Sequence, residues 1–111
     1  FHCALMRPAA EAMAEALSKV EMEAPAVPLV ANVIASQVTD PEEIRDLLVR
    51  QVTGTVRWRE SVLYMKEQGV LQLVELGAGK VLSGLARRID KDLSGTAVGT
   101  PADIEAFLAA L

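Results

Sequence analysis

The chain has 111 residues with a formal net charge of −4, and 51% of its residues are hydrophobic while only 4% are aromatic. This apolar content argues against a disordered chain, and the acidic balance argues against general binding to nucleic acid or to an anionic membrane surface. The single cysteine, Cys3, rules out an internal disulfide and fits a reducing, cytosolic setting. No apolar run is long enough to span a bilayer, so the sequence predicts no membrane segment.

Helical and strand patterns alternate along the chain. Five segments carry apolar residues at helical spacing, and three short segments are typical of strands. Prolines at first helical positions, Asp40 and Thr100 as N-caps, and glycines at helix ends mark the boundaries. In chain order the pattern predicts helix 6–20, strand 27–34, helix 41–53, helix 57–68, strand 70–76, helix 81–90, strand 96–99 and a last helix from 101.

This order predicts an α/β fold, with a parallel sheet covered by helices on both faces. Three strands make a thin sheet, whose exposed edge would be a liability unless something else covered it. The chain also opens with Phe1-His2-Cys3 and has no initiating Met. Both features favour a piece of a longer protein, and the end at Leu111, just after a capped helix, favours a chain terminus there.

The loop from Gly77 to Lys80 lies between a predicted strand and a predicted helix, as phosphate-binding loops do. Its spacing does not fit such a loop. A Walker loop requires glycine where Val74 stands, and a dinucleotide fingerprint requires glycine at Leu82. A tight strand-to-helix turn is therefore the favoured interpretation.

Few residues suit catalysis by type alone. His2 is the only histidine, and with one cysteine it makes a metal site improbable, so we expect none. Glu42 and Glu43 occupy a first helical turn, where capping explains them. The basic pair Arg87 and Arg88 falls late in a helix, where it interacts favourably with the helix C-terminus or docks an acidic partner.

Several local strings, taken in order, resemble the malonyl-CoA:acyl carrier protein transacylase family over nearly the whole chain. They are residues 1–10 (FHCALMRPAA), Asn32-Val33, residues 44–51, residues 56–62 and residues 75–85 (ELGAGKVLSGL). The resemblance implies that residues 1–111 are the C-terminal segment of an acyltransferase core domain. That core is a hydrolase-like parallel sheet, and the family's ferredoxin-like subdomain is not in this chain.

The resemblance also implies a reaction: malonyl transfer from coenzyme A to acyl carrier protein, in the cytoplasm, through a serine ester in fatty acid biosynthesis. His2 matches the general base, and Gln51 matches a residue whose backbone carbonyl orients that histidine. Phe1 and Asn32 match positions beside the substrate, and Arg87 and Arg88 match a face that docks the carrier protein. The implied partners are the carrier protein and the rest of the transacylase chain, and no cofactor is implied beyond these substrates.

The chain holds no Gly-x-Ser-x-Gly motif for the nucleophile, so we expect it to be inactive by itself. Thr55 and Ala78 stand where family members often have proline. Two alternatives remain open. One is an acyltransferase domain of a polyketide or multidomain fatty acid synthase, and the other is a non-catalytic binding module that kept the fold.

Overall fold

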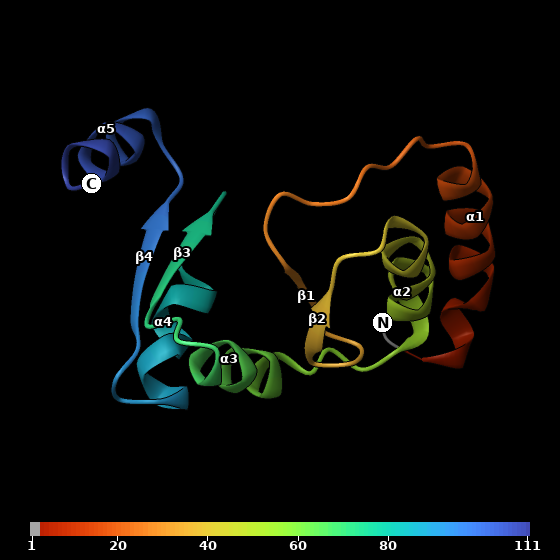
Figure 1. Cartoon of the computed structure of the whole chain (residues 1–111), viewed down its shortest axis with the longest axis horizontal. Helices are drawn as coiled ribbons and strands as arrows, with labels where there is room; N and C mark the ends of the chain where they lie inside the picture. Colours follow the sequence, from red (N-terminus) through yellow and green to blue (C-terminus); the bar gives the residue numbers. More distant parts are fainter. Residues whose placement is uncertain (1–2) are drawn as a thin grey trace. The chain divides into compact units, whose positions relative to one another are not determined.

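A computed structural model describes residues 3–111 of the chain. The chain divides into two compact units, Phe1–Tyr64 and Met65–Leu111, called here the N-terminal and the C-terminal unit. Figure 1 shows the helices and strands of both units. The elements of the first are the 3-10 turn η1 (Ala4–Met6), α1 (Arg7–Ser18), β1 (Leu29–Ala31), β2 (Ser36–Val38), α2 (Pro41–Thr53) and the start of α3 (Trp58–Glu67).

The N-terminal unit is built on the pairing of α1 with α2. Both helices start with proline near their first position, and Asp40 caps α2 by accepting a hydrogen bond from the Glu43 backbone N–H at 3.1 Å. The Arg45 guanidinium, near the start of α2, donates to the backbone oxygens of Leu17 and Val20 at the end of α1. The two helices are thereby antiparallel, as Figure 1 shows, with the end of α2 beside the start of α1.

The predicted strand over 27–34 is wrong in its length and in its surroundings. Only Leu29–Ala31 form a strand, β1; the chain then turns and pairs back as β2 in an antiparallel ladder from Leu29↔Val38 to Ala31↔Ser36. Val27 is 72% exposed, so the apolar run does not begin as a buried strand. Ala35 adopts a φ of 50° in the turn, a conformation that its sequence does not signal.

A small apolar core closes the N-terminal unit. Val38, Ile44 and Leu47 are each less than a tenth exposed, and they join β2 to the inner face of α2. The partly buried side chains packed around them are Met22, Ala31, Val33 and Ile34. This core fixes β1 and β2 against α2, the arrangement on which the candidate site depends.

The C-terminal unit contains a β-α-β motif with the predicted order of elements, which confirms the predicted α/β class. Its elements are the end of α3, β3 (Gln72–Leu76), α4 (Val81–Ile89), β4 (Ser94–Val98) and α5 (Pro101–Ala109). β3 and β4 pair in parallel, in register from Gln72↔Ser94 to Leu76↔Val98. Because parallel neighbours need a crossover connection, α4 lies between them in sequence and packs on both strands.

Two expectations for this part of the chain need correction. In place of one three-stranded parallel sheet, the described residues form two separate two-stranded sheets, and the one in the N-terminal unit is antiparallel. The helical spacing of Ile104, Phe107, Leu108 and Leu111 predicts that the last helix packs inward along this stripe, yet the stripe is largely exposed. Ile104 is 49% exposed, Leu108 60% and Leu111 84%, and of this stripe only Phe107 is partly buried.

Helix boundaries agree more closely with the sequence. Thr100 forms the predicted capping box, accepting from the Asp103 backbone while the Asp103 carboxylate accepts from the Thr100 backbone, both at 3.1 Å. Gly54 ends α2, and Gly69 follows α3 with a φ of 94°. Across residues 3–111, no helix combines the length and the hydropathy needed to cross a membrane.

Candidate active-site segment and basic surface

Two of the predicted site residues, Phe1 and His2, lie outside the described residues. The structure does describe Gln51 and Asn32, which the resemblance places beside the histidine and the substrate. It also describes Arg87 and Arg88, in the other unit. The position of the general base therefore rests on the sequence, while its expected surroundings can be examined directly.

Gln51 lies in the last turn of α2. Backbone carbonyls in this turn have no N–H donor four residues further along the same helix. The Gln51 carbonyl accepts from the Gly54 N–H at 3.2 Å. The Gln51 side chain is turned to the chain that leaves the helix, with Nε2 donating to the backbone oxygens of Gly54 and Thr55 at 3.3 and 3.2 Å. The Gln51 side chain therefore binds the backbone that follows α2.

The segment that directly follows His2 lies close to this turn. η1, which begins at Ala4, contacts α2, and Figure 1 shows it at the end of α2 where the helix finishes. The fold therefore brings η1, which follows His2 in the sequence, into contact with the helix that carries Gln51.

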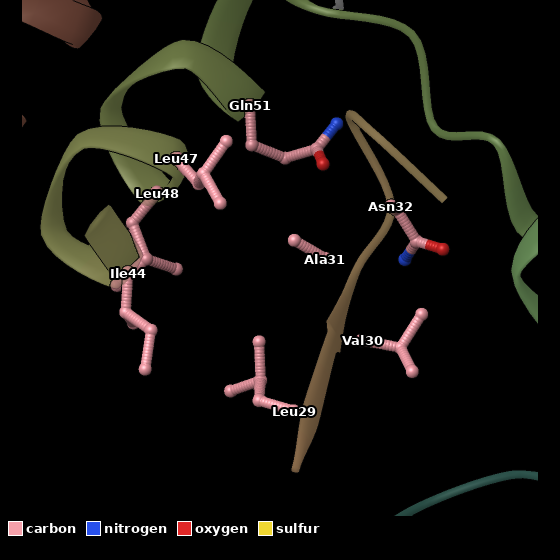
Figure 2. Close-up of a pocket in the computed structure, with 8 residues that line it drawn as sticks. All are labelled: Leu29, Val30, Ala31, Asn32, Ile44, Leu47, Leu48 and Gln51. Atoms are coloured by element: carbon pink, nitrogen blue, oxygen red, sulfur yellow. The ribbon is translucent and has the colours of Figure 1, made fainter. Parts of the chain in front are cut away.

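A cavity of about 240 Å³ opens between β1 and α2. Figure 2 shows its lining: aliphatic side chains form most of both walls, Asn32 lies at the end of β1 and Gln51 at the end of α2. The aliphatic residues are Leu29, Val30, Ala31, Ile44, Leu47 and Leu48. An apolar cavity with a few polar groups is the usual form of a small-molecule site.

Asn32 is held at two points. Its backbone oxygen accepts from the Arg57 N–H at 3.1 Å, and its side-chain Oδ1 accepts from the Ser61 hydroxyl at 2.7 Å. Ser61 is 1% exposed, in α3, and its Oγ also lies 2.8 Å from the Arg57 carbonyl. The turn after β1 is thus fastened to the start of α3.

The strand-to-helix turn at Gly77 to Lys80 is not an open phosphate site. Gly77 and Gly79 have φ values of 125° and 92°, so glycine is required by the turn itself. The Glu75 carboxylate accepts hydrogen bonds from the backbone N–H of Leu82 at 3.4 Å and of Ser83 at 3.0 Å. The backbone N–H of Ser83 lowers the pKa of Glu75, so this carboxylate is the anion that occupies the start of α4.

The basic pair Arg87 and Arg88 is exposed in the last turn of α4. Nearby acidic side chains are engaged elsewhere: Lys66 donates to Asp90 at 2.5 Å and to Asp92 at 3.3 Å. The bond from Lys66 lowers the pKa of Asp90, and the bond to Asp90 raises the pKa of Lys66. With both carboxylates turned to Lys66, the two arginines leave a positive surface at the end of α4.

The described part of the chain contains no group of histidine, cysteine, aspartate or glutamate side chains suited to hold a metal ion. Sequence reasoning missed two residues that shape the site. Ser61 lies in the family-like string 56–62, but its contact with Asn32 gives no signal in the sequence, because the two residues are 29 positions apart. Glu75 lies in the family-like string 75–85. Its role at the start of α4 becomes clear only from the fold, in which its carboxylate accepts from a backbone N–H seven residues further along the chain.

Comparison with known proteins gives a consistent result. No protein-family profile matches the chain. The malonyl CoA-acyl carrier protein transacylase of Escherichia coli strain K12 is 48% identical over 107 residues, which is 96% of this chain and 35% of that protein. The crystal structure of an acyl-carrier-protein-S-malonyltransferase from Bartonella henselae superposes with a TM-score of 0.92 and 55% identity, over 99% of this chain and 35% of that one.

A third relative is a malonyl-transacylase solved in complex with its type II PKS acyl-carrier protein. It superposes with a TM-score of 0.90 and 44% identity, over 99% of this chain and 36% of its own. These findings confirm the resemblance drawn from the sequence. The chain is homologous to the malonyl CoA-acyl carrier protein transacylases and spans about a third of their length.

Proposed function

We propose that this chain is the C-terminal portion of a malonyl-CoA:acyl carrier protein transacylase of fatty acid biosynthesis, acting in the cytoplasm. The observation that carries the proposal is the match of nearly the whole chain to a malonyl CoA-acyl carrier protein transacylase at 48% identity and to an acyl-carrier-protein-S-malonyltransferase at 55% identity and a TM-score of 0.92. The nucleophilic serine would come from the rest of the full-length protein, and this chain supplies the base.

In the proposed reaction the serine oxygen attacks the malonyl thioester carbonyl, and its proton passes to His2. Coenzyme A leaves as the thiol with that proton, and a malonyl ester stays on the serine. The phosphopantetheine thiol of the carrier protein then attacks the ester and gives up its proton to His2, and the serine oxygen leaves with that proton as malonyl passes to the thiol as a thioester. No metal or further cofactor takes part.

The role of Gln51 is to orient the histidine. Its backbone carbonyl, in the last turn of α2, accepts from one ring N–H of His2 and leaves the other ring nitrogen to take the serine proton. The position of η1 beside α2 supports this pairing. Phe1 and Asn32 lie against the substrate, Phe1 as a bulky neighbour of the base and Asn32 through its amide.

The acyl carrier protein docks on the basic surface at the end of α4. Arg87 and Arg88 are exposed there, and a positive surface suits an acidic partner. We expect Arg87→Glu with Arg88→Glu to raise the KM for carrier protein much more than the KM for malonyl-CoA. Equal changes in both KM values would contradict docking at this surface.

A polyketide system is the second candidate. The solved complex contains a type II PKS acyl-carrier protein, and the transacylase in it is 44% identical to this chain. The chemistry is the same in both systems, and only the carrier protein differs. Transfer rates to a fatty-acid and to a polyketide carrier protein, measured side by side, decide between them.

The function is tested by malonyl transfer with the full-length protein and its His2→Ala variant. We expect the unsubstituted protein to load malonyl onto carrier protein, and the variant to lose at least about 100-fold in rate, the lower end of what a general base contributes. Glu11→Gln, on the exposed side of α1, is a matched surface control. Near-normal transfer by His2→Ala would refute the assignment of the base.

A further inference from the structure

Lys66 binds the two carboxylates that share a cleft with Arg87 and Arg88. It lies in the last turn of α3, and its Nζ donates to Asp90 Oδ2 at 2.5 Å and to Asp92 Oδ2 at 3.3 Å. An ammonium group has three donors, so one lysine can make both bonds. Only 29% of the Lys66 side chain and 22% of the Asp90 side chain are exposed, and salt screens a partly buried pair less than an exposed one.

The loop that carries both carboxylates is held in place by its backbone. Leu93, which is 2% exposed, directly follows them, and its N–H donates to the Asp90 carbonyl at 3.2 Å. The Asp92 N–H donates to Asp90 Oδ1 at 2.9 Å, and the Asp90 N–H donates to the Ala86 carbonyl at 3.1 Å. The two carboxylates therefore stay beside the end of α4, and the cations within their reach decide what they pair with.

The charged groups line one open cleft of about 460 Å³ in the C-terminal unit. Its cations are Lys66, Arg87, Arg88 and Lys91, and its anions are Asp90 and Asp92. Among the described residues, neither arginine side chain makes a hydrogen bond or an ion pair, while both carboxylates are bound to Lys66. Without Lys66, the two arginines and Lys91 would be the cations left for these carboxylates. A carboxylate paired with an arginine competes for it with an acidic partner.

We propose that Lys66 is a positioning residue for carrier-protein binding: it holds the two carboxylates of the cleft away from Arg87 and Arg88. Both guanidinium groups thereby stay free to bind acidic side chains of the carrier protein. The inference rests on the proposed function, and it names the residue that keeps the proposed docking surface positive. Lys66 acts through the two carboxylates and not by contact with the carrier protein.

The test uses the full-length protein, with holo carrier protein and malonyl-CoA as the varied substrates. Lys66→Met removes the ammonium group and keeps a long side chain. We expect its KM for carrier protein to rise about threefold to tenfold, as for one or two lost ion pairs, with the KM for malonyl-CoA unchanged. Lys66→Arg keeps a cation beside the carboxylates and should retain the low KM. Lys91→Met is the charge-matched control, because it removes one positive charge from the same cleft and leaves Lys66 in place; it should raise the KM less.

A second substitution separates this role from a purely structural one. Asp90→Asn removes the carboxylate that Lys66 binds at 2.5 Å. Added to Lys66→Met, it should return the KM for carrier protein to near the unsubstituted value, because the freed carboxylate is gone. A structural role predicts no such recovery, since the bond from α3 to this loop is missing in both variants. Melting temperatures of all variants, measured alongside, show whether each variant is folded.

The outcomes separate the two proposals. A KM for carrier protein that rises no more in Lys66→Met than in Lys91→Met, or that does not recover in the double variant, overturns the inference and leaves the proposed function standing. No malonyl transfer by the unsubstituted full-length protein overturns both. A larger rise in Lys66→Met, reversed by Asp90→Asn, supports the role of Lys66.

Discussion

Gly95 in β4 has no room for a side chain. A Cβ placed on it would lie 2.6 Å from the Ser83 carbonyl oxygen, 2.9 Å from Ser83 Cα and 3.1 Å from the Ser83 carbonyl carbon. All three are backbone atoms of α4, so no side-chain rotation relieves the clash. Glu75 further fixes Ser83 by binding its backbone N–H and its hydroxyl, each at 3.0 Å.

We therefore expect Gly95→Ala to push α4 away from β4 and to destabilise the protein. Inserting a methyl group into a tightly packed site costs about 1–3 kcal/mol, and clashes with backbone place this variant in the upper half of that range. Gly84→Ala is the matched control, since Gly84 follows Ser83 directly in α4. A Cβ added at Gly84 meets nothing within 4 Å, and alanine in a helix interior is favoured over glycine by up to about 1 kcal/mol.

The assay is urea unfolding of the full-length protein and both variants, with amide hydrogen exchange to locate the change. Exchange in Gly95→Ala should accelerate in β3, β4 and α4, while Gly84→Ala should show equal or slower exchange there. A Gly95→Ala protein as stable as the unsubstituted one, with unchanged exchange in β4, would refute the close approach of α4 to this strand.

Three further predictions concern stability. Leu47 is buried on the inner face of α2, so Leu47→Ala should cost about 2–5 kcal/mol in the free energy of unfolding. Leu48, on the same helix, is 46% exposed, and Leu48→Ala should cost much less; similar losses in the two variants would contradict the core. Asp40→Ala removes the α2 N-cap and should cost about 1 kcal/mol, with Asp40→Asn restoring most of it in thermal unfolding. Hydrogen bonds from Ser83 lower the pKa of Glu75, so the stability that this carboxylate adds is present above the ordinary glutamate pKa of about 4.3 and is lost as the pH falls through the lower folded value. The free energy of unfolding of Glu75→Gln should therefore depend less on pH below about 4.3 than that of the unsubstituted protein. An identical pH dependence would argue against the contact.

Local chemistry made much of the fold predictable. Asp40 before Pro41 and Thr100 before Pro101 can be recognised as helix starts from the local sequence alone, and both N-caps are present. The parallel pairing of β3 with β4 follows from the strand–helix–strand order alone. These features depend on residues that are near one another in sequence.

The errors lie where distant residues decide. The apolar run over 27–34 looks like one buried strand, but it contains the whole of the short strand β1 and a turn, because the chain reverses to pair β1 with β2. The sequence of a strand does not show which other strand it pairs with. The exposed stripe of α5 has the same origin: periodicity shows that a helix has an apolar face, and it does not show what that face packs against.

The candidate site divides in the same way. His2, Gln51 and Asn32 were proposed because local strings resemble a family, and the structure adds the contact of η1 with the α2 that carries Gln51 and the cavity that Gln51 and Asn32 share. The Ser61 contact with Asn32 and the Glu75 contact with α4 required coordinates, since each joins residues from different elements.

The most direct test of the central claim is the intact mass of the full-length protein after brief exposure to malonyl-CoA without carrier protein. The account predicts a gain of one malonyl group, lost again when holo carrier protein is added, and no such gain in His2→Ala over the same time. A protein that gains no malonyl group, or a His2→Ala variant that gains it as fast as the unsubstituted protein, would contradict the claim that this chain supplies the base for malonyl transfer.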